Sequence, residues 1–314
     1  NQIERVEILR GPASSLYGAD AIGGVVQVFT RQGSGPFTPY FDVGGGSYDT
    51  FKASGGFTGS AENWRYALNA GTEYSKGFNS ISNPKNYSYN PDRDGFRQNS
   101  VSGNLAYAFN KDNEAGINVF YSNGENDFDA GPTTDDSNKQ ALSSYNTYLR
   151  NALTANWTST LRAGRSVDDS QNYTDDLRSS KFRTNQNQYL WQNDISSSFG
   201  TFLAALERLE QNVESTTAYS QTSRNINSAM LGWRGQFDAH SLQANVRNDD
   251  NSQFGDKTTG SIAYGYQITP AWRTNIGYGT GFRAPTFNDL YFPLSFGFQG
   301  NPNLKPETSR NIEA

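Results

Sequence analysis

The sequence contains no cysteine, one methionine and one histidine among its 314 residues. Without cysteine, the chain can form no disulfide framework, thiol nucleophile or thiolate metal site. The single histidine, His240, cannot supply a histidine-rich metal cluster. The net charge is −5 and the pI is about 5.0, so the composition gives no reason to expect a nucleic-acid partner.

Long apolar runs are absent as well. No stretch reaches the roughly 18 apolar residues of a membrane helix, and no signal-peptide pattern opens the chain, which we interpret as starting inside a mature protein. Only 34% of residues are hydrophobic, but 14% are aromatic and 31 are glycine, which is too aromatic for a disordered chain. A polar, aromatic-rich and glycine-rich chain is typical of a bacterial outer-membrane β-barrel, whose wall is apolar only toward lipid.

Alternation with a period of two is the main structural signal. Between Trp64 and Tyr74, aromatic and apolar residues fall on one face, while Arg65, Asn69 and Glu73 fall on the other. A polar face of this kind suits a wet lumen, so the pattern predicts an all-β transmembrane antiparallel barrel. We expect thirteen strands, near residues 37–44, 50–58, 64–75, 97–109, 114–122, 142–155, 159–168, 188–198, 202–211, 226–236, 241–248, 258–268 and 272–279.

The predicted connections alternate in length, as they do in membrane barrels with short turns on one rim and long loops on the other. Residues Thr201–Gln211 have high helix propensity, but the alternation of rims requires a strand there. Short turns are expected at 110–113, 156–159 and 238–240, and long loops at 76–96, 123–141, 169–187, 212–225 and 280–314.

The first 33 residues follow another pattern. Apolar residues from Ile3 to Leu9 lead to a Gly11-Pro12 break, and a second apolar run, Val25–Phe29, follows. This predicts a small buried α+β unit, the plug segment (residues 1–33), before a barrel at residues 34–314. Plugged barrels have about 22 strands, so thirteen strands would make an incomplete wall.

Two long motifs carry a family resemblance. The stretch IERVEILRGPASSLYGADAIGGVVQVFTR (Ile3–Arg31) resembles the last part of the plug of TonB-dependent outer-membrane receptors. The stretches GTGFRAPTFNDLY (Gly279–Tyr291) and GNPNLKPETS (Gly300–Ser309) resemble a barrel signature of the same superfamily. Within it, RNDDNSQFG (Arg247–Gly255), and NPDRDGF (Asn90–Phe96) with its spacing to FDAG, are most similar to the cobalamin (vitamin B-12) receptors.

The resemblance implies a transporter rather than an enzyme, located in the outer membrane of a Gram-negative bacterium. It implies energised import of cobalamin or a related corrinoid, driven by the TonB–ExbB–ExbD complex, in contact with outer-membrane lipid and lipopolysaccharide. The resemblance further implies that the TonB box, most of the plug and the last barrel strands lie outside this sequence, so we do not expect this piece alone to transport.

Carboxylates gather in two predicted loops on one rim. Asp92 and Asp94 lie in the first loop, and four more aspartates between 127 and 136 lie in the second. Like charges brought together repel unless a cation neutralises them, and calcium prefers such oxygen ligands; a solvated acidic surface is the alternative. The resemblance implies calcium as a loop-ordering ion, with Asp92, Asp94, Asp129 and Asp136 as ligands and Asn79 where the family has an aspartate.

Charged residues of the plug segment form a second candidate site. An arginine enclosed by a barrel needs carboxylate partners. The functional interpretation is a polar plug–barrel interface that rearranges when TonB pulls, and the alternative is static packing. The expected interface residues are Arg5, Arg10, Arg31 and Glu7, with Glu4 and lumen-facing Glu73 as further candidate partners.

Other functions remain as alternatives. Haem uptake is disfavoured because no histidine lies between Arg283–Pro285 and Asn301–Leu304, whereas ferric-siderophore uptake stays open. An outer-membrane hydrolase would need a histidine near the long loops, and His240 falls in a short turn on the opposite rim. A passive porin is opposed by the plug segment.

Overall fold

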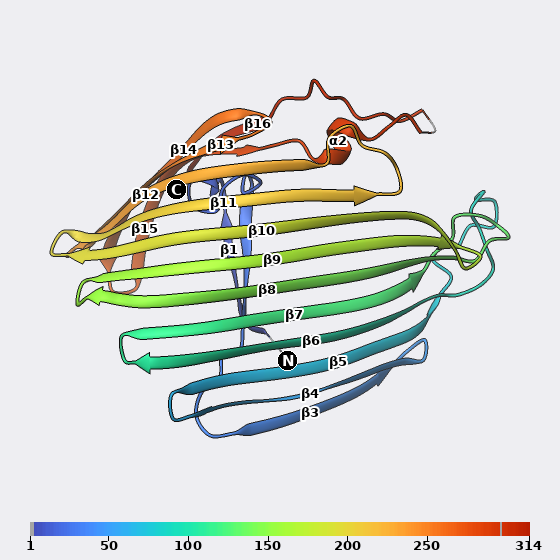
Figure 1. Cartoon of the computed structure of the whole chain (residues 1–314), viewed down its shortest axis with the longest axis horizontal. Helices are drawn as coiled ribbons and strands as arrows, with labels where there is room; N and C mark the ends of the chain where they lie inside the picture. Colours follow the sequence, from blue (N-terminus) through green and yellow to red (C-terminus); the bar gives the residue numbers. More distant parts are fainter. Residues whose placement is uncertain (1–2, 296) are drawn as a thin grey trace.

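The computed structural model describes residues 3–295 and 297–314. Its strands form two separate antiparallel sheets. The large sheet has fourteen strands, β3 to β16, and each strand pairs with its neighbours in the chain (Figure 1). Its strands are β3 (Thr38–Gly46), β4 (Thr50–Ala61), β5 (Trp64–Phe78), β6 (Asp94–Asn110), β7 (Asn113–Asp127), β8 (Asp136–Thr154), β9 (Trp157–Thr174), β10 (Leu177–Ser197), β11 (Gly200–Ser215), β12 (Ser223–Phe237), β13 (His240–Asn251), β14 (Gly255–Thr269), β15 (Trp272–Arg283) and β16 (Glu307–Glu313).

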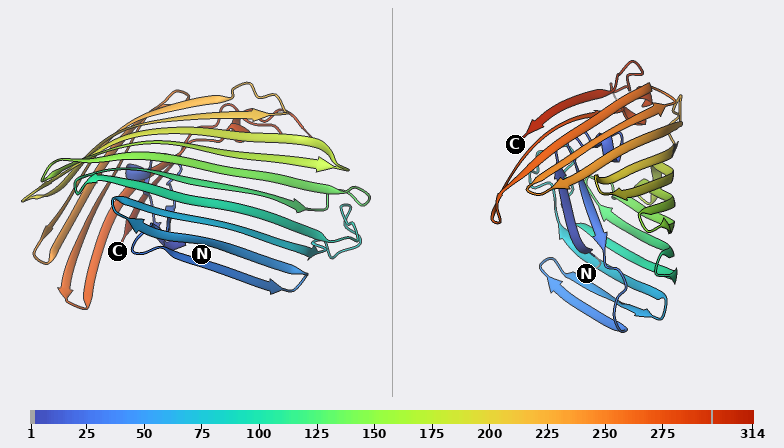
Figure 2. Two further views of the ribbon diagram at one scale, coloured as in Figure 1. Left: turned by 60° about the horizontal axis from the view of Figure 1, so that its bottom comes forward. Right: turned by 90° about the vertical axis from the view of Figure 1, so that its left-hand side faces the viewer.

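The large sheet curves into a trough, and the plug segment lies on its concave side (Figure 2). The strand order runs from β16 to β3 without a pairing between these two edges, so the described strands form an open wall. The plug segment contains β1 (Ile3–Arg10), α1 (Ser14–Tyr17) and β2 (Gly24–Thr30), with β1 antiparallel to β2. The predicted α+β character is therefore confirmed, while the boundary at residue 33 stays a prediction.

The predicted faces of the strands are confirmed by the exposure of apolar side chains. On β13, Arg247 and Asp249 are buried on the concave side, whereas Val246 on the opposite face is exposed. Leu231 and Val246 are directly paired across β12 and β13, and both are exposed. Rows of this kind on the convex face are the surface that meets hydrocarbon in a membrane barrel. No helix in the described ranges has the length and apolar character that a membrane crossing requires.

The buried core is small and lies inside the trough. Ala13 of the plug segment, Phe282 at the end of β15 and Leu290 of α2 (Phe287–Tyr291) are nearly inaccessible to solvent. These residues come from parts of the chain about 270 positions apart, so the core joins the plug segment to the last long connection. The core therefore fastens the plug segment to one side of the wall.

Several predicted boundaries are wrong. The described residues form fourteen wall strands, one more than the thirteen ranges predicted, because β16 lies within the predicted loop 280–314. The predicted loop 169–187 is strand except for a tight turn at Asp175 and Asp176, both with positive φ. The connections predicted at 123–141 and 212–225 shrink to 128–135 and 216–222. Strand ends that extend beyond the bilayer are wet on both faces, so the apolar alternation disappears before the hydrogen-bonded ladder does. The strand assignment at Thr201–Gln211 is confirmed by β11.

Candidate functional site

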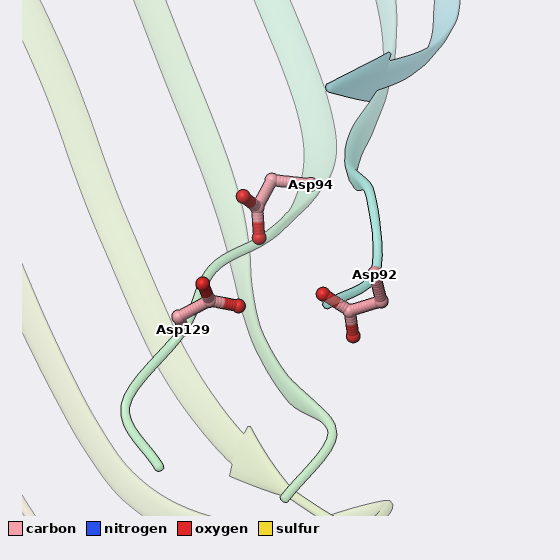
Figure 3. A group of neighbouring side chains, drawn as sticks. All are labelled: Asp92, Asp94 and Asp129. Carbon is pink, nitrogen blue, oxygen red and sulfur yellow. The ribbon is translucent and has the colours of Figure 1, made fainter. Parts of the chain in front are cut away.

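Three of the predicted calcium ligands come together at the long-loop rim. Asp92 precedes β6, Asp94 begins it, and Asp129 follows β7. One oxygen of each carboxylate lies within 4.8 Å of the other two, and the side chains face a common space (Figure 3). We call these three residues the acidic group. Hard carboxylate oxygens in an adaptable loop are the donor type that calcium prefers.

Hydrogen bonds order the first acidic loop and link it to the second. The Asn90 side-chain amide donates to Asp92 Oδ2 at 2.7 Å and to the Thr134 carbonyl oxygen at 3.3 Å. Ser88 Oγ donates to the Ala130 carbonyl oxygen at 3.2 Å. The Ser80 backbone N–H donates to Asp94 Oδ2 at 2.6 Å. The Asn90–Thr134 and Ser88–Ala130 bonds therefore link the two loops, and the other two bonds order the first loop.

The acidic group concentrates negative charge. Desolvation by the surrounding loops, followed by the charges of Asp129 and Asp94, raises the pKa of Asp92 above that of a free aspartate. The ionised form of Asp92 is therefore disfavoured in this arrangement. A cation bound among the three carboxylates would remove that repulsion.

Two further predicted ligands are engaged elsewhere. Asp136 is buried and is not part of the acidic group: its Oδ1 accepts from Thr174 Oγ1 at 2.7 Å, and its Oδ2 accepts from Thr134 Oγ1 at 2.6 Å. The Asn79 amide donates to the Asn90 carbonyl oxygen, and its Oδ1 accepts from the Ile81 backbone N–H at 2.9 Å. In this arrangement, Asp136 and Asn79 brace the loops that carry the acidic group.

Of the three carboxylates expected as partners of the plug arginines, Glu4 and Glu7 pair with Arg5, and Glu73, within the described part of the chain, does not. Arg5 pairs with its own strand neighbour Glu7 at 2.7 Å, and with Glu4 at 3.7 Å. Glu73 on the wall pairs instead with Lys52 at 2.7 Å. Arg31 meets the wall through its backbone, whose carbonyl oxygen accepts from the Asn104 amide at 2.7 Å. Arg10 lines a groove that β14, β15 and β16 also line.

A buried ionic network on the wall was missed by the sequence analysis. Arg247 donates to Asp249 Oδ1 at 2.8 Å, to Glu207 Oε2 at 3.0 Å and to Ser228 Oγ at 2.8 Å. The side chain of Asp249 is completely buried. The sequence held a signal for it: Arg247, Asp249 and Asn251 alternate with residues of the opposite face, which places three polar side chains on the lumen side of one strand.

The plug segment rests on this part of the wall through its corner, residues 11–23. The Oγ atoms of Ser15 and Ser261 are 2.8 Å apart, and the Phe282 backbone N–H donates to Ser14 Oγ at 3.3 Å. Gly18, with φ of 81°, approaches Arg247 so closely that a Cβ there would lie 3.0 Å from Nη2. The corner is thus fitted to the same arginine that organises the ionic network.

The other side of the trough is arranged differently. The β1–β2 hairpin faces β5 to β8 across a cavity of about 540 Å³. Asn104, Asn118 and Asn146 line this cavity and are directly paired across β6, β7 and β8. The acidic group lies in the loops of these same strands.

Two family models match the chain. The model described as "TonB dependent receptor-like, beta-barrel" matches residues 16–314, and the "TonB-dependent Receptor Plug Domain" matches residues 1–25. Among curated proteins, the chain is similar to a "Vitamin B12 transporter BtuB" of Photobacterium profundum. The two are 32% identical over 320 residues, which are 99% of this chain and 50% of that protein.

Solved structures share the fold at low sequence identity. The siderophore receptor PirA of Acinetobacter baumannii matches with a TM-score of 0.78 and 17% identity, over 99% of this chain and 54% of that one. A mutant of the ferric enterobactin receptor PfeA of Pseudomonas aeruginosa matches with a TM-score of 0.77 and 16% identity, over 99% and 55%. The chain thus spans about half the length of the relatives it matches.

Proposed function

The chain belongs to the TonB-dependent receptors of the Gram-negative outer membrane, a family of transporters rather than enzymes, and from this premise we propose that the complete protein imports cobalamin or a close corrinoid. In this proposal, the TonB–ExbB–ExbD complex supplies the energy. The convex apolar face contacts outer-membrane lipid and lipopolysaccharide, and the substrate enters from the long-loop rim.

The observation that carries the substrate proposal is the 32% identity to a vitamin B12 transporter over nearly the whole chain. The siderophore receptors among the solved structures are 16% and 17% identical, which supports the fold and does not choose a substrate. His240 lies at the start of β13, where its Nδ1 is 2.7 Å from the Tyr264 hydroxyl, on the rim opposite the acidic group. That position gives no support to a hydrolase at the long loops.

Calcium is the second part of the proposal. Asp92, Asp94 and Asp129 supply carboxylate oxygens, and backbone carbonyls or water complete the six to eight ligands that calcium takes. Asp136 and Asn79, which were expected as ligands, instead hold the loops in place through their hydrogen bonds to Thr134, Thr174, Ile81 and Asn90. The bound ion would hold the loops over the substrate entrance.

The charged residues of the plug segment complete the proposal. Arg5, Glu7, Arg10 and Arg31 belong to the surface that separates from the barrel during import. The Arg5–Glu7 pair lies within one strand, so it can move with the plug segment without losing its partner. This arrangement would keep both charges paired when the hairpin is displaced.

The test is a binding measurement on the complete receptor in detergent micelles. Cyanocobalamin and a ferric siderophore are titrated in parallel, each with calcium and with a chelator. We expect saturable, calcium-enhanced binding of cyanocobalamin only. The D94N variant should lower calcium affinity by at least about tenfold, because it removes a charged ligand. The matched control is D112N, which changes an aspartate in a short turn of the opposite rim.

The two parts of the proposal can fail separately. Binding of the siderophore and not of cyanocobalamin would overturn the substrate. Cyanocobalamin affinity that does not change with calcium would overturn the proposed ion site, as would an equal loss of calcium affinity in D94N and D112N. Neither result would contradict cobalamin as the substrate.

A further inference from the structure

A second polar pocket lies on the lumen side of the wall near the short-turn rim, between the end of β10 and the start of β15. It has a volume of about 610 Å³ and adjoins the groove that holds the corner of the plug segment, with which it shares Gln243 and Ala263. Two arginines line it, Arg234 near the end of β12 and Arg273 near the start of β15. No aspartate or glutamate is among its lining residues.

The lack of a carboxylate sets this pocket apart from the two ion-paired clusters of the lumen. Elsewhere on the concave face, Arg65 pairs with Glu114, and Arg247 pairs with Glu207 and Asp249. Within residues 3–295 and 297–314, neither Arg234 nor Arg273 comes within 4.0 Å of a carboxylate oxygen. Two guanidinium groups therefore share one concave space without a counter-ion from the described chain.

Neutral polar groups and small residues give the pocket a defined shape. Ser241, Gly265 and Asn275 form one row across β13, β14 and β15. Arg273 Nη2 donates to Ser241 Oγ at 2.7 Å, which orients the guanidinium along this row. A Cβ on Gly265 would lie 2.5 Å from Ser241 Oγ and 2.8 Å from Arg273 Nη2, so a larger residue would push these side-chain ends from their present positions.

We propose that this pocket binds an oxyanion, either a phosphate ester or a carboxylate, at the short-turn end of the lumen. The planar guanidinium fork matches both anions with two parallel N–H···O bonds. Asn275 and Gln243 offer neutral amide donors beside the two arginines. The site lies at the rim opposite the acidic group and does not depend on which substrate the receptor imports.

The test uses inorganic phosphate and acetate as probes on the complete receptor in a non-ionic detergent at low ionic strength. Calorimetric titration should give one saturable site for which phosphate and acetate compete. The R234Q and R273Q variants should each weaken phosphate binding by about tenfold or more, because a charge-assisted hydrogen-bonded pair is lost. The matched control is R162Q, which removes an exposed charge from the same concave face outside the pocket.

Urea unfolding of R234Q and R273Q in micelles should match that of the unmodified receptor, which shows that these variants are folded whatever substrate the receptor imports. The milder S241A variant, which frees Arg273 from its hydroxyl partner, should shift phosphate affinity in the same direction by a smaller factor. Absence of saturable phosphate binding would overturn the proposal. An equal loss of phosphate affinity in R162Q would also overturn it, because the affinity would then depend on the overall positive charge of the lumen and not on this pocket.

Discussion

The plug segment meets two sectors of the wall in different ways. In the docked sector, β12 to β15, its corner touches the wall through Ser14, Ser15 and Gly18, above a buried ionic network. In the open sector, β5 to β8, its hairpin faces a cavity of about 540 Å³. Both sectors are built from the same alternating strands, so the difference comes from their inward side chains.

The two sectors also balance their charges differently. In the docked sector, Arg247 is neutralised by Asp249 of its own strand and by Glu207 of β11, so both partners come from the wall itself. The open sector carries the acidic group at its rim, where the charges raise the pKa of Asp92 and no cationic side chain joins the three carboxylates as an ion pair within the described residues. The chain therefore neutralises the buried charges of the docked sector itself, while the carboxylates of the open sector are suited to bind an added cation.

The largest effect is expected from R247A in the docked sector of the complete receptor. Removing this arginine leaves buried Asp249 and Glu207 without a counter-charge, which costs about 3–5 kcal/mol of unfolding free energy. Urea unfolding in micelles, followed by tryptophan fluorescence, measures the change. R162A removes an exposed lumen arginine and should stay near the unmodified protein. If R247A lowered the unfolding free energy by less than about 1 kcal/mol, the buried ionic network would not be what stabilises the docked sector.

A smaller effect is expected from G18A. Gly18 has φ of 81° and ψ of −162°, a region that is essentially restricted to glycine, and the new Cβ would press on Arg247. The strain should cost about 1–3 kcal/mol and loosen the corner of the plug segment. Limited proteolysis of residues 11–23 reports the loosening. G23A is the matched control, since a Cβ at Gly23 meets no atom within 4 Å and the two variants should differ clearly.

The next effect concerns α2, whose Leu290 belongs to the buried core together with Phe282 of β15. Asp289 accepts from the Thr286 backbone N–H at 2.8 Å and Thr286 Oγ1 accepts from the Asp289 backbone N–H at 3.1 Å. These bonds lower the pKa of Asp289, so its contribution is present at neutral pH and is lost only as pH falls below the ordinary aspartate range. D289A should cost about 1 kcal/mol locally, measured by hydrogen exchange of residues 287–292.

In unmodified protein the same exchange, corrected for intrinsic rates, should stay constant from pH 7 to about 5 and rise only at lower pH. A rise that begins near neutral pH would contradict the cap assignment.

The smallest effect is expected in the open sector. Asn118 lines the cavity and lies between Asn104 and Asn146 in the ladder. Because no buried charge depends on it, N118A should change the unfolding free energy by less than about 0.5 kcal/mol. Urea unfolding beside R247A gives a direct comparison of the sectors. Equal losses in both variants would remove the distinction drawn between them.

Much of the fold could be predicted from the sequence. The period of two assigned the lipid and lumen faces because it is a local property of each strand, as Val246 and Arg247 show. The break at Gly11-Pro12 marked the end of the first apolar run, now β1, for the same reason. The strand ends around Asp175 could not be found, since a strand that is wet on both faces has no apolar alternation.

The candidate sites also depend partly on local sequence and partly on tertiary contacts. The sequence alone placed aspartates in two loops of one rim, and the family resemblance pointed to calcium. Only the tertiary structure decided that Asp92, Asp94 and Asp129 converge while Asp136 turns to Thr174. It also decided that Arg247 forms an ion pair with Glu207, while Arg234 and Arg273 share a pocket without a carboxylate. Such contacts depend on strand register and loop closure between residues far apart in the chain, which no local pattern encodes.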